Sequence, residues 1–201
     1  MKCMKNLILA SNSPRRKEIL NLLGRKFEIK TSKVDEFFSK IFDEEIIKKN
    51  SLIKASGVKQ EGVRNALIIG ADTMVILDSV CLVKPQNVIE ALFMLKKLSN
   101  KTHIVVTSHT IINSETGENL TELSKSYVTF RKLNLFEIIN YILTKNPLDK
   151  AGSYGIQDFI SINEINNPPK SSFIKSLDGS YYNVMGLDID LIQRMLEKLE
   201  K

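Results

Sequence analysis

Short apolar runs alternate along the chain with longer segments in which apolar residues recur at helical spacing. The runs expected to form strands are residues 7–10, 27–30, 67–70, 74–77, 80–83, 103–110 and 126–130, followed by a late hairpin of 173–176 with 181–184. The segments expected to form helices are 14–23, 43–62, 88–98, 135–143 and 191–199. Alternation of the two kinds of element predicts an α/β fold.

Length, charge and cysteine content narrow the class of protein. The 201 residues suit one domain of ordinary size, or two closely packed lobes. Lys and Arg (29) outnumber Asp and Glu (23), which favours anionic ligands in general. Cys3 and Cys81 have no paired spacing, so we expect neither a disulfide framework nor a cysteine zinc site. No apolar run is long enough for a signal peptide or a membrane span, and we expect a cytoplasmic protein.

The segment from residue 7 to residue 17 predicts a phosphate site. An apolar strand leads into a turn in which Ser13 suits the N-cap of a helix and Pro14 its first position. Arg15, Arg16 and Lys17 then add positive charge to the end of the helix that its dipole already makes positive. An anionic partner compensates such crowding. The alternative is a solvated basic turn.

Two acidic positions are candidates for chemistry. Asp72 follows a buried predicted strand directly, and the ends of strands are where α/β proteins place ligand sites. Asp35 and Glu36 form a second acidic pair. Two separated carboxylates suffice for Mg²⁺, which completes its shell with water and phosphate oxygens. Lys54 and Lys84 are candidate phosphate cations. The alternatives are an Asp that caps a turn, an exposed acidic turn and solvated lysines.

Other catalytic signatures are missing from the sequence. It contains neither the G-x-S-x-G turn of hydrolases nor the glycine-rich motifs of phosphate loops and dinucleotide-binding folds. His103 and His109 share one face of a predicted strand without a third metal ligand, so we interpret them as ordinary strand residues. The irregular segments 146–157 and 165–172 are of the kind that often carries function.

Seven segments in order resemble the Maf family of nucleoside triphosphate pyrophosphatases across nearly the whole chain. They are LILASNSPRRKEIL, VDE at 34–36, GADTMV at 70–75, KP at 84–85, LSNKTH, VTFRKL and PLDKAGSYGIQ. The resemblance implies an elongated α/β fold with a twisted mixed sheet flanked by helices, and two lobes around a central cleft. It also implies a divalent cation, a homodimer, and hydrolysis of a nucleoside triphosphate to its monophosphate and pyrophosphate. The implied role is removal of non-standard nucleotides or restraint of cell division.

The resemblance assigns roles to individual positions. Asp72 matches the family's proton acceptor, with Mg²⁺ or Mn²⁺ held by Asp72 and Glu36. The positions expected to contact the phosphates are Ser11, Arg16, Lys54 and Lys84. The positions expected to choose the base are Arg15, Thr73 and Gln157, which match the branch similar to dTTP and UTP pyrophosphatases. That branch also accepts modified uridine triphosphates. The 7-methyl-GTP branch has Trp and Gln at the first two places and a Ser-Glu pair near the third.

The chain departs from the family pattern at a few positions. Ser79, Val83, Asn100 and Asp188 stand where other residues are usual, and none is a proposed catalytic group. Asp158 follows GIQ where glycine is usual, and the segment 158–172 lengthens the loop beside the expected base pocket.

A protein that binds a nucleotide as a sensor, or binds nucleic acid, is the alternative to an enzyme. Such a protein would use the same basic helix start but would need neither Asp72 nor a metal. Because paired carboxylates repel a nucleic-acid backbone, the sequence favours chemistry on a metal-bound triphosphate.

Overall fold

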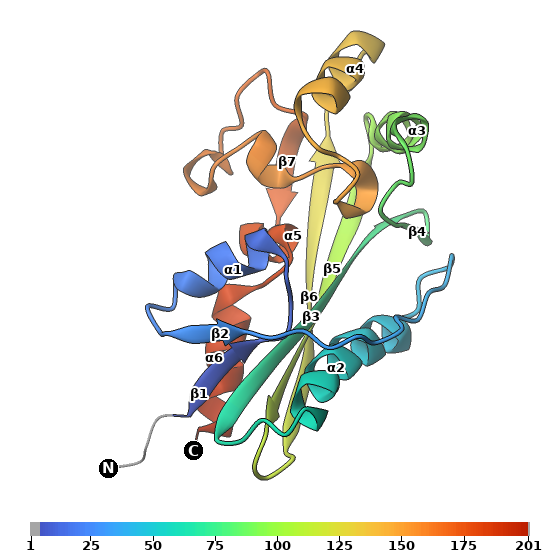
Figure 1. The fold of residues 1–201 in the computed structure, drawn as a ribbon. Coiled ribbons are helices and arrows are strands. Elements are labelled where there is room, and N and C mark those ends of the chain that lie inside the picture. Colours follow the sequence, from blue (N-terminus) through green and yellow to red (C-terminus); the bar gives the residue numbers. More distant parts are fainter. Residues whose placement is uncertain (1–4, 201) are drawn as a thin grey trace.

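A seven-stranded mixed sheet forms the centre of the molecule (Figure 1). The computed structural model describes residues 5–200, so Cys3 lies outside the described residues. The strands are β1 (Asn6–Leu9), β2 (Phe27–Ile29), β3 (Ala66–Leu77), β4 (Val80–Leu82), β5 (Thr102–Asn113), β6 (Asn119–Phe130) and β7 (Ile174–Asp178). Their order is β2-β1-β3-β5-β6-β7, and β4 pairs with β3. β1 runs parallel to β2 and β3, and the remaining pairs are antiparallel.

Six α-helices are found between residues 5 and 200, together with three short 3₁₀ turns. The helices are α1 (Pro14–Asn21), α2 (Glu44–Gln60), α3 (Val88–Leu98), α4 (Leu135–Thr144), α5 (Tyr181–Met185) and α6 (Ile189–Leu199). The 3₁₀ turns are Ala151–Ser153, Ile156–Asp158 and Ile162–Glu164. Figure 1 shows an elongated molecule, with α3, α4 and β7 towards one end of the long strands and β1, β2 and α1 nearer the other. The predicted α/β fold with a mixed sheet is confirmed; its treatment as one domain or as two packed lobes stays a prediction.

The core lies on both faces of the sheet, which explains why its central strand reads as almost continuously apolar. Leu67 and Ile69 of β3 pack in the larger cluster, with residues of α1, α3, α4 and α6. Ile68 packs on the opposite face, against Ala55 and Val58 of α2. Because side chains alternate along a strand, neighbouring residues of β3 serve different faces.

The runs 67–70 and 74–77, predicted as separate strands, are one continuous strand. β5 pairs with β3 from Leu67 to Ile76, so the hydrogen-bond ladder passes through the polar pair Asp72 and Thr73. The expectation that Asp72 follows a strand end is therefore wrong, because its neighbours on both sides remain in the sheet. Likewise β6 begins at Asn119, earlier than the predicted residue 126.

The second half of the predicted late hairpin is a helix. Ser180 caps α5, its side chain accepting a hydrogen bond from the backbone N–H of Asn183 over 3.1 Å. Gly186 ends the helix in the left-handed conformation, with φ of 111°. Capping at both ends thus determines a five-residue helix where apolar content alone predicted a strand.

Candidate active site

The cleft lies beside a gap in the pairing of β3. On the edge opposite β5, β1 pairs with β3 as far as Ile69, and β4 pairs with it again from Val75. Within residues 5–200, no strand pairs with the intervening stretch on that edge. A cleft of about 730 Å³ borders this stretch. Side chains from both faces of β3 reach it there, because Asp72 and Thr73 are adjacent and both line it.

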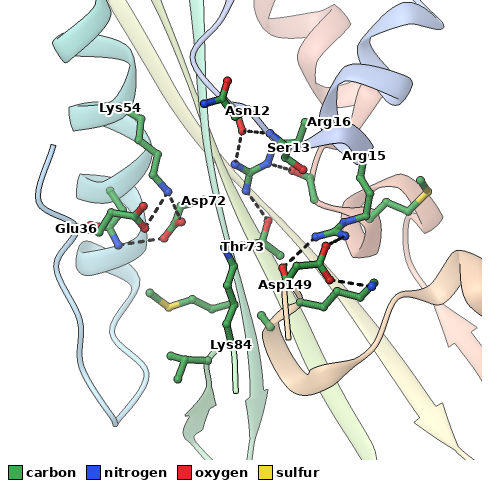
Figure 2. Close-up of a pocket in the computed structure, with 18 of the residues that line it drawn as sticks. Asn12, Ser13, Arg15, Arg16, Glu36, Lys54, Asp72, Thr73, Lys84 and Asp149 are labelled. Atoms are coloured by element: carbon green, nitrogen blue, oxygen red, sulfur yellow. Dashed lines mark hydrogen bonds and ion pairs between the residues drawn. The ribbon is translucent and has the colours of Figure 1, made fainter. Parts of the chain in front are cut away.

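All nine site residues predicted from the sequence line this one cleft. They are Ser11, Arg15, Arg16, Glu36, Lys54, Asp72, Thr73, Lys84 and Gln157. The fold therefore brings together residues that are up to 146 positions apart in the chain. Figure 2 labels seven of the nine, all except Ser11 and Gln157. Their individual roles stay predictions.

On the α2 side, two carboxylates converge on one ammonium group. Lys54 Nζ lies 2.7 Å from Asp72 Oδ1 and 3.0 Å from Glu36 Oε2. Lys54 comes from α2, Asp72 from the middle of β3, and Glu36 from the irregular segment between β2 and α2. Figure 2 shows the three side chains pointing toward one another.

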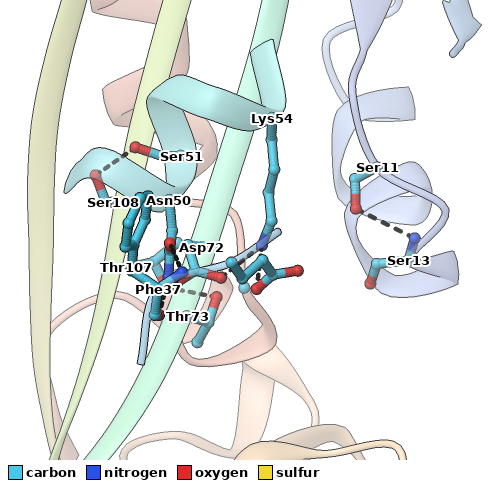
Figure 3. A network of polar contacts seen from close by, with 12 residues as sticks. Ser11, Ser13, Phe37, Asn50, Ser51, Lys54, Asp72, Thr73, Thr107 and Ser108 are labelled. Atoms are coloured by element: carbon cyan, nitrogen blue, oxygen red, sulfur yellow. Dashed lines mark hydrogen bonds and ion pairs between the residues drawn. The ribbon is translucent and has the colours of Figure 1, made fainter. Parts of the chain in front are cut away.

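Asn50 completes this cluster and is not among the residues predicted from the sequence. Its Nδ2 donates to Asp72 Oδ2 over 3.0 Å and to the carbonyl of Phe37 over 2.9 Å (Figure 3). Its Oδ1 accepts from the backbone N–H of Phe37 over 2.8 Å. Asn50 is 1% exposed. The signal in the sequence is a polar residue three positions after Ile47 and four before Lys54, on one face of the helix. A simple amphipathic pattern assigns that position to the apolar core, so it does not indicate a functional residue.

Close packing of α2 on β3 sets the reach of Asn50 and Lys54. A Cβ atom on Gly70 would lie 2.2 Å from the carbonyl oxygen of Ser51, so only glycine allows this approach. The Ser51 hydroxyl is 2.8 Å from both Ser108 Oγ and Thr110 Oγ1 of β5. These buried hydrogen bonds fix the helix against the sheet, and Figure 3 shows the one between Ser51 and Ser108.

Across the cleft, the Arg16 side chain makes hydrogen bonds to residues of three different parts of the fold. Its Nε donates to the carbonyl of Gly186 over 2.9 Å, its Nη1 to Ser11 Oγ over 3.2 Å, and its Nη2 to Thr73 Oγ1 over 3.1 Å. Burial lowers the pKa of Arg16, and the charges of Asp72 and Glu36 oppose that shift. The start of α1, the centre of β3 and the end of α5 are thereby joined by one cation.

Arg15 occupies the rim of the same wall. Its Nη1 lies 2.9 Å from Asp149 Oδ2, and its Nη2 donates to the carbonyl of Asp149 over 3.3 Å (Figure 2). Lys150 also reaches Asp149, over 2.8 Å. Burial alone would raise the pKa of Asp149, but hydrogen bonds from Lys150 and Arg15 outweigh it and lower that pKa. The positive rim therefore carries one ionised carboxylate.

The predicted helix start is confirmed, with a difference in its cap. Ser13 is the N-cap and Pro14 opens the helix, but the Ser13 side chain makes no capping hydrogen bond. Instead its backbone N–H donates to Ser11 Oγ over 3.3 Å. The Ser13 hydroxyl is thus not used by the helix that it begins.

Gln157 lies in the 3₁₀ turn Ile156–Asp158 and lines the cleft. Its Oε1 atom is buried and has no hydrogen-bond partner. A buried amide oxygen without a donor is costly unless a ligand supplies one. This acceptor is therefore suited to an N–H group of a bound molecule.

The donor set suits a hard divalent cation that shares its shell with a ligand. Two carboxylates meet at one point of the cleft, where the Lys54 ammonium already contacts both. Mg²⁺ is commonly held by one or two carboxylates together with waters and substrate phosphates. Groups of three or more His, Cys, Asp or Glu side chains suited to a metal are absent from the described part of the chain.

Fold and cleft together define an α/β protein whose binding site places basic side chains opposite paired carboxylates. The sequence model of the family described as "Maf-like protein" matches residues 6–199. The chain therefore belongs to the Maf family. Among residues 5–200, no helix is long and apolar enough to cross a membrane.

Curated relatives match over nearly their whole length. The dTTP/UTP pyrophosphatase of Caldicellulosiruptor saccharolyticus is 38% identical, over 98% of this chain and 96% of the relative. That of Thermotoga maritima is 39% identical, over 94% and 87%, and that of Bacillus mycoides 42%, over 98% and 97%. Among solved structures, protein VC0702 from Vibrio cholerae has a TM-score of 0.33 and 11% identity, over 71% of this chain and 72% of that one, which is too weak to inform function.

Proposed function

We propose that this protein is a nucleoside triphosphate pyrophosphatase that hydrolyses dTTP and UTP, and modified uridine triphosphates, to the monophosphate and pyrophosphate. The observation that carries the proposal is the convergence of Asp72, Glu36 and Lys54 in a cleft whose opposite wall holds Arg15 and Arg16. The relatives that match over nearly their whole length are named dTTP/UTP pyrophosphatases, which supports the same reaction.

Asp72 acts as the proton acceptor in this mechanism. A water molecule attacks the α-phosphorus and loses a proton to Asp72, while the bond from the α-phosphorus to the bridging oxygen breaks and pyrophosphate leaves. Asn50 holds one oxygen of Asp72 and Lys54 the other, so the carboxylate is oriented before substrate arrives. Such positioning lowers the entropic cost of bringing water and phosphorus together.

A divalent cation, Mg²⁺ or Mn²⁺, would be held by Asp72 and Glu36 and would neutralise charge on the phosphate oxygens. The protein's own cations have the same electrostatic task. Lys54, Lys84 and Arg16 line the cleft where they can offset charge that builds up on the leaving pyrophosphate. The hydroxyl of Ser11, which accepts from Arg16, contributes to binding the phosphates.

Base selection follows from the free acceptor of Gln157. Thymine and uracil carry an N–H at ring position 3, whereas cytosine has an unprotonated nitrogen there. The buried Oε1 of Gln157 can accept from that N–H but would be left unpaired by cytosine. Arg15 and Thr73 complete the set of residues proposed to contact the base or sugar.

The test is pyrophosphate release from dTTP, UTP, CTP, GTP and 7-methyl-GTP, with and without Mg²⁺, by the wild-type protein and by Asp72→Asn. We expect metal-dependent release that favours dTTP and UTP. We expect Asp72→Asn to lose at least about 100-fold in kcat while remaining folded. Binding without release from any of the five, or normal turnover by a folded Asp72→Asn protein, would overturn the proposal.

The quaternary state and cellular location are separate proposals. We propose a homodimer, as the family resemblance implies, and a cytoplasmic location, as expected from the sequence, which has no long apolar run. Sedimentation equilibrium tests the first point: a mass near twice the 22.8 kDa of one chain supports it, and a monomer at micromolar concentration contradicts it.

A further inference from the structure

The hydroxyl of Tyr141 makes hydrogen bonds on both sides of Gln157, to residues of the same turn. The backbone N–H of Gly155 donates to Tyr141 Oη over 3.3 Å, and Tyr141 Oη donates to Asp158 Oδ2 over 2.6 Å. Gln157 lies between these two attachment points. The turn is also closed by its own backbone, since the N–H of Asp158 donates to the carbonyl of Gly155 over 3.1 Å.

Tyr141 is itself immobilised. It comes from α4 and is 5% exposed. Its ring stacks on Phe159, with ring centres 4.9 Å apart and planes inclined by 29°, and it also contacts the ring of Phe173. The start of α4 is fixed by a capping box of Asn134 and Glu137. The hydroxyl that holds the turn is therefore attached to a rigid support.

The Gln157 side chain folds back over Gly155. A Cβ atom at Gly155 would lie 2.7 Å from Gln157 Nε2 and 2.9 Å from Oε1, so the amide rests directly on that backbone. On the other side, Tyr154 Oη is 2.7 Å from His103 Nε2, which attaches the preceding residue to β5. Any movement of the Gly155 backbone would thus move the buried acceptor Oε1.

We propose that Tyr141 and Asp158 are positioning residues that fix the Gln157 amide and thereby set the preference for bases with an N–H at ring position 3. This inference rests on the proposed function. Neither residue lines the cleft, whereas Gly155 and Gln157 both do, so the pair acts through the turn and not on the substrate. Asp158 thus receives a role at the position where the family usually has glycine.

The hydrogen bond between Tyr141 and Asp158 is well suited to hold the turn in place. Burial, followed by the hydrogen bond to Asp158, raises the pKa of Tyr141 above its ordinary value. The hydroxyl is therefore harder to deprotonate than that of a free tyrosine, and it remains the donor to Asp158 Oδ2. A charge-assisted hydrogen bond of this kind is stronger than one between neutral groups.

The test compares kcat/KM for UTP and CTP in Tyr141→Phe, Asp158→Ala and Asp158→Asn. Because discrimination by a positioned hydrogen bond is lost when the bond is misplaced, we expect Tyr141→Phe and Asp158→Ala to reduce the UTP/CTP ratio about tenfold. The loss should lie in KM for UTP, with kcat within about threefold of wild type. Asp158→Asn keeps an acceptor for the hydroxyl and should retain the ratio.

Tyr127→Phe is the matched control, since Tyr127 lies half-exposed on β6, away from the cleft lining. Inhibition by inorganic tripolyphosphate, which has no base, should be equal in all variants. A folded Tyr141→Phe protein with the wild-type UTP/CTP ratio would overturn the inference. If Tyr141→Phe does not fold, an Asp158→Ala protein with the wild-type UTP/CTP ratio would overturn it. Failure of the proposed function is recognised separately, because the wild-type protein would then release no pyrophosphate from UTP.

Discussion

Asn50 Nδ2 donates a hydrogen bond to Asp72 Oδ2 over 3.0 Å, and both side chains are at least nine-tenths buried. The same amide holds the backbone of Phe37, the residue after Glu36. One side chain therefore sets the distance between the segment that carries Glu36 and the carboxylate of Asp72. This link gives the candidate site its geometry before any ligand binds.

Replacing Asn50 by leucine, which is similar in size, should lower activity without abolishing folding. The variant leaves Asp72 Oδ2 without its amide donor and releases the Phe37 backbone. Because orientation of catalytic groups is worth factors of ten or more, we expect kcat to fall about tenfold or further. The Mg²⁺ concentration for half-maximal rate should rise several-fold, since side chains that hydrogen-bond to a metal's carboxylate ligands change metal affinity by about 10- to 100-fold.

The measurement is a Mg²⁺ titration of the initial rate. Gln60→Leu is the control, because Gln60 is exposed at the end of the same helix. An Asn50→Leu protein with wild-type kcat and wild-type Mg²⁺ dependence would show that the amide does not position Asp72.

Asp149→Asn should strengthen nucleotide binding. The substitution removes a carboxylate that pairs with Arg15 at the rim of the cleft, where the two side chains are 46% and 22% exposed. Since exposed ion pairs contribute little, the free energy of unfolding should change by less than about 1 kcal/mol. Arg15 then becomes available to an anionic ligand, so KM for dTTP should fall several-fold at low salt.

Varying the salt concentration distinguishes an electrostatic effect of Asp149→Asn on KM from a structural change in the cleft. Screening weakens interactions between exposed charges, so the difference in KM should shrink as ionic strength rises from 0.05 M toward about 1 M, where the Debye length is about 3 Å. An increase in KM at low salt would mean instead that Asp149 holds Arg15 in its binding position.

Much of the site follows from sequence, because it depends on residues placed by short local patterns. Ser13 and Pro14 mark the start of α1, and the stripe from Val88 to Leu98 marks α3. The match of motifs to a family located the nine predicted site residues, all of which line the cleft. What local pattern cannot show is register between elements: whether β3 continues through Asp72, or which residue of α2 faces it.

The same limit explains the residues that were missed. In the sequence, Asn50 is only one polar residue in a helix. Its contact with Asp72 depends on how closely α2 approaches β3 at Gly70, which the sequence does not show. Tyr141 and Asp158 are 17 positions apart and meet only through the packing of α4 on the turn. The aromatic residues of α5 favoured a strand in the sequence, but capping by Ser180 and Gly186 outweighs that preference and makes the segment a helix.

Two buried histidines should make stability depend on pH. Burial lowers the pKa of His103 to about 3 and that of His109 to about 4, from an ordinary value of 6.5. The unfolded chain therefore binds protons that the folded chain does not, and stability is full above pH 6.5 and is lost as pH falls toward 4. Between pH 6 and pH 5, each histidine should cost about 1 kcal/mol per pH unit.

Urea unfolding at pH 7.5, 6 and 5 measures this slope. His109→Gln keeps an acceptor for the backbone N–H of Asp188, which bonds to His109 Nε2 over 2.9 Å, but does not titrate. Its slope between pH 6 and pH 5 should be smaller than that of wild type by about 1 kcal/mol per pH unit. An unchanged slope would show that His109 titrates normally in the folded protein.

The most direct test of the proposed reaction is hydrolysis of dTTP in ¹⁸O-labelled water, with mass analysis of both products. Attack of water on the α-phosphorus, with Asp72 as proton acceptor, predicts one labelled oxygen in the monophosphate and none in pyrophosphate. Asp72→Asn should slow the appearance of that label without changing its position. Label in pyrophosphate or in free phosphate would place the attack at another phosphorus and contradict the mechanism.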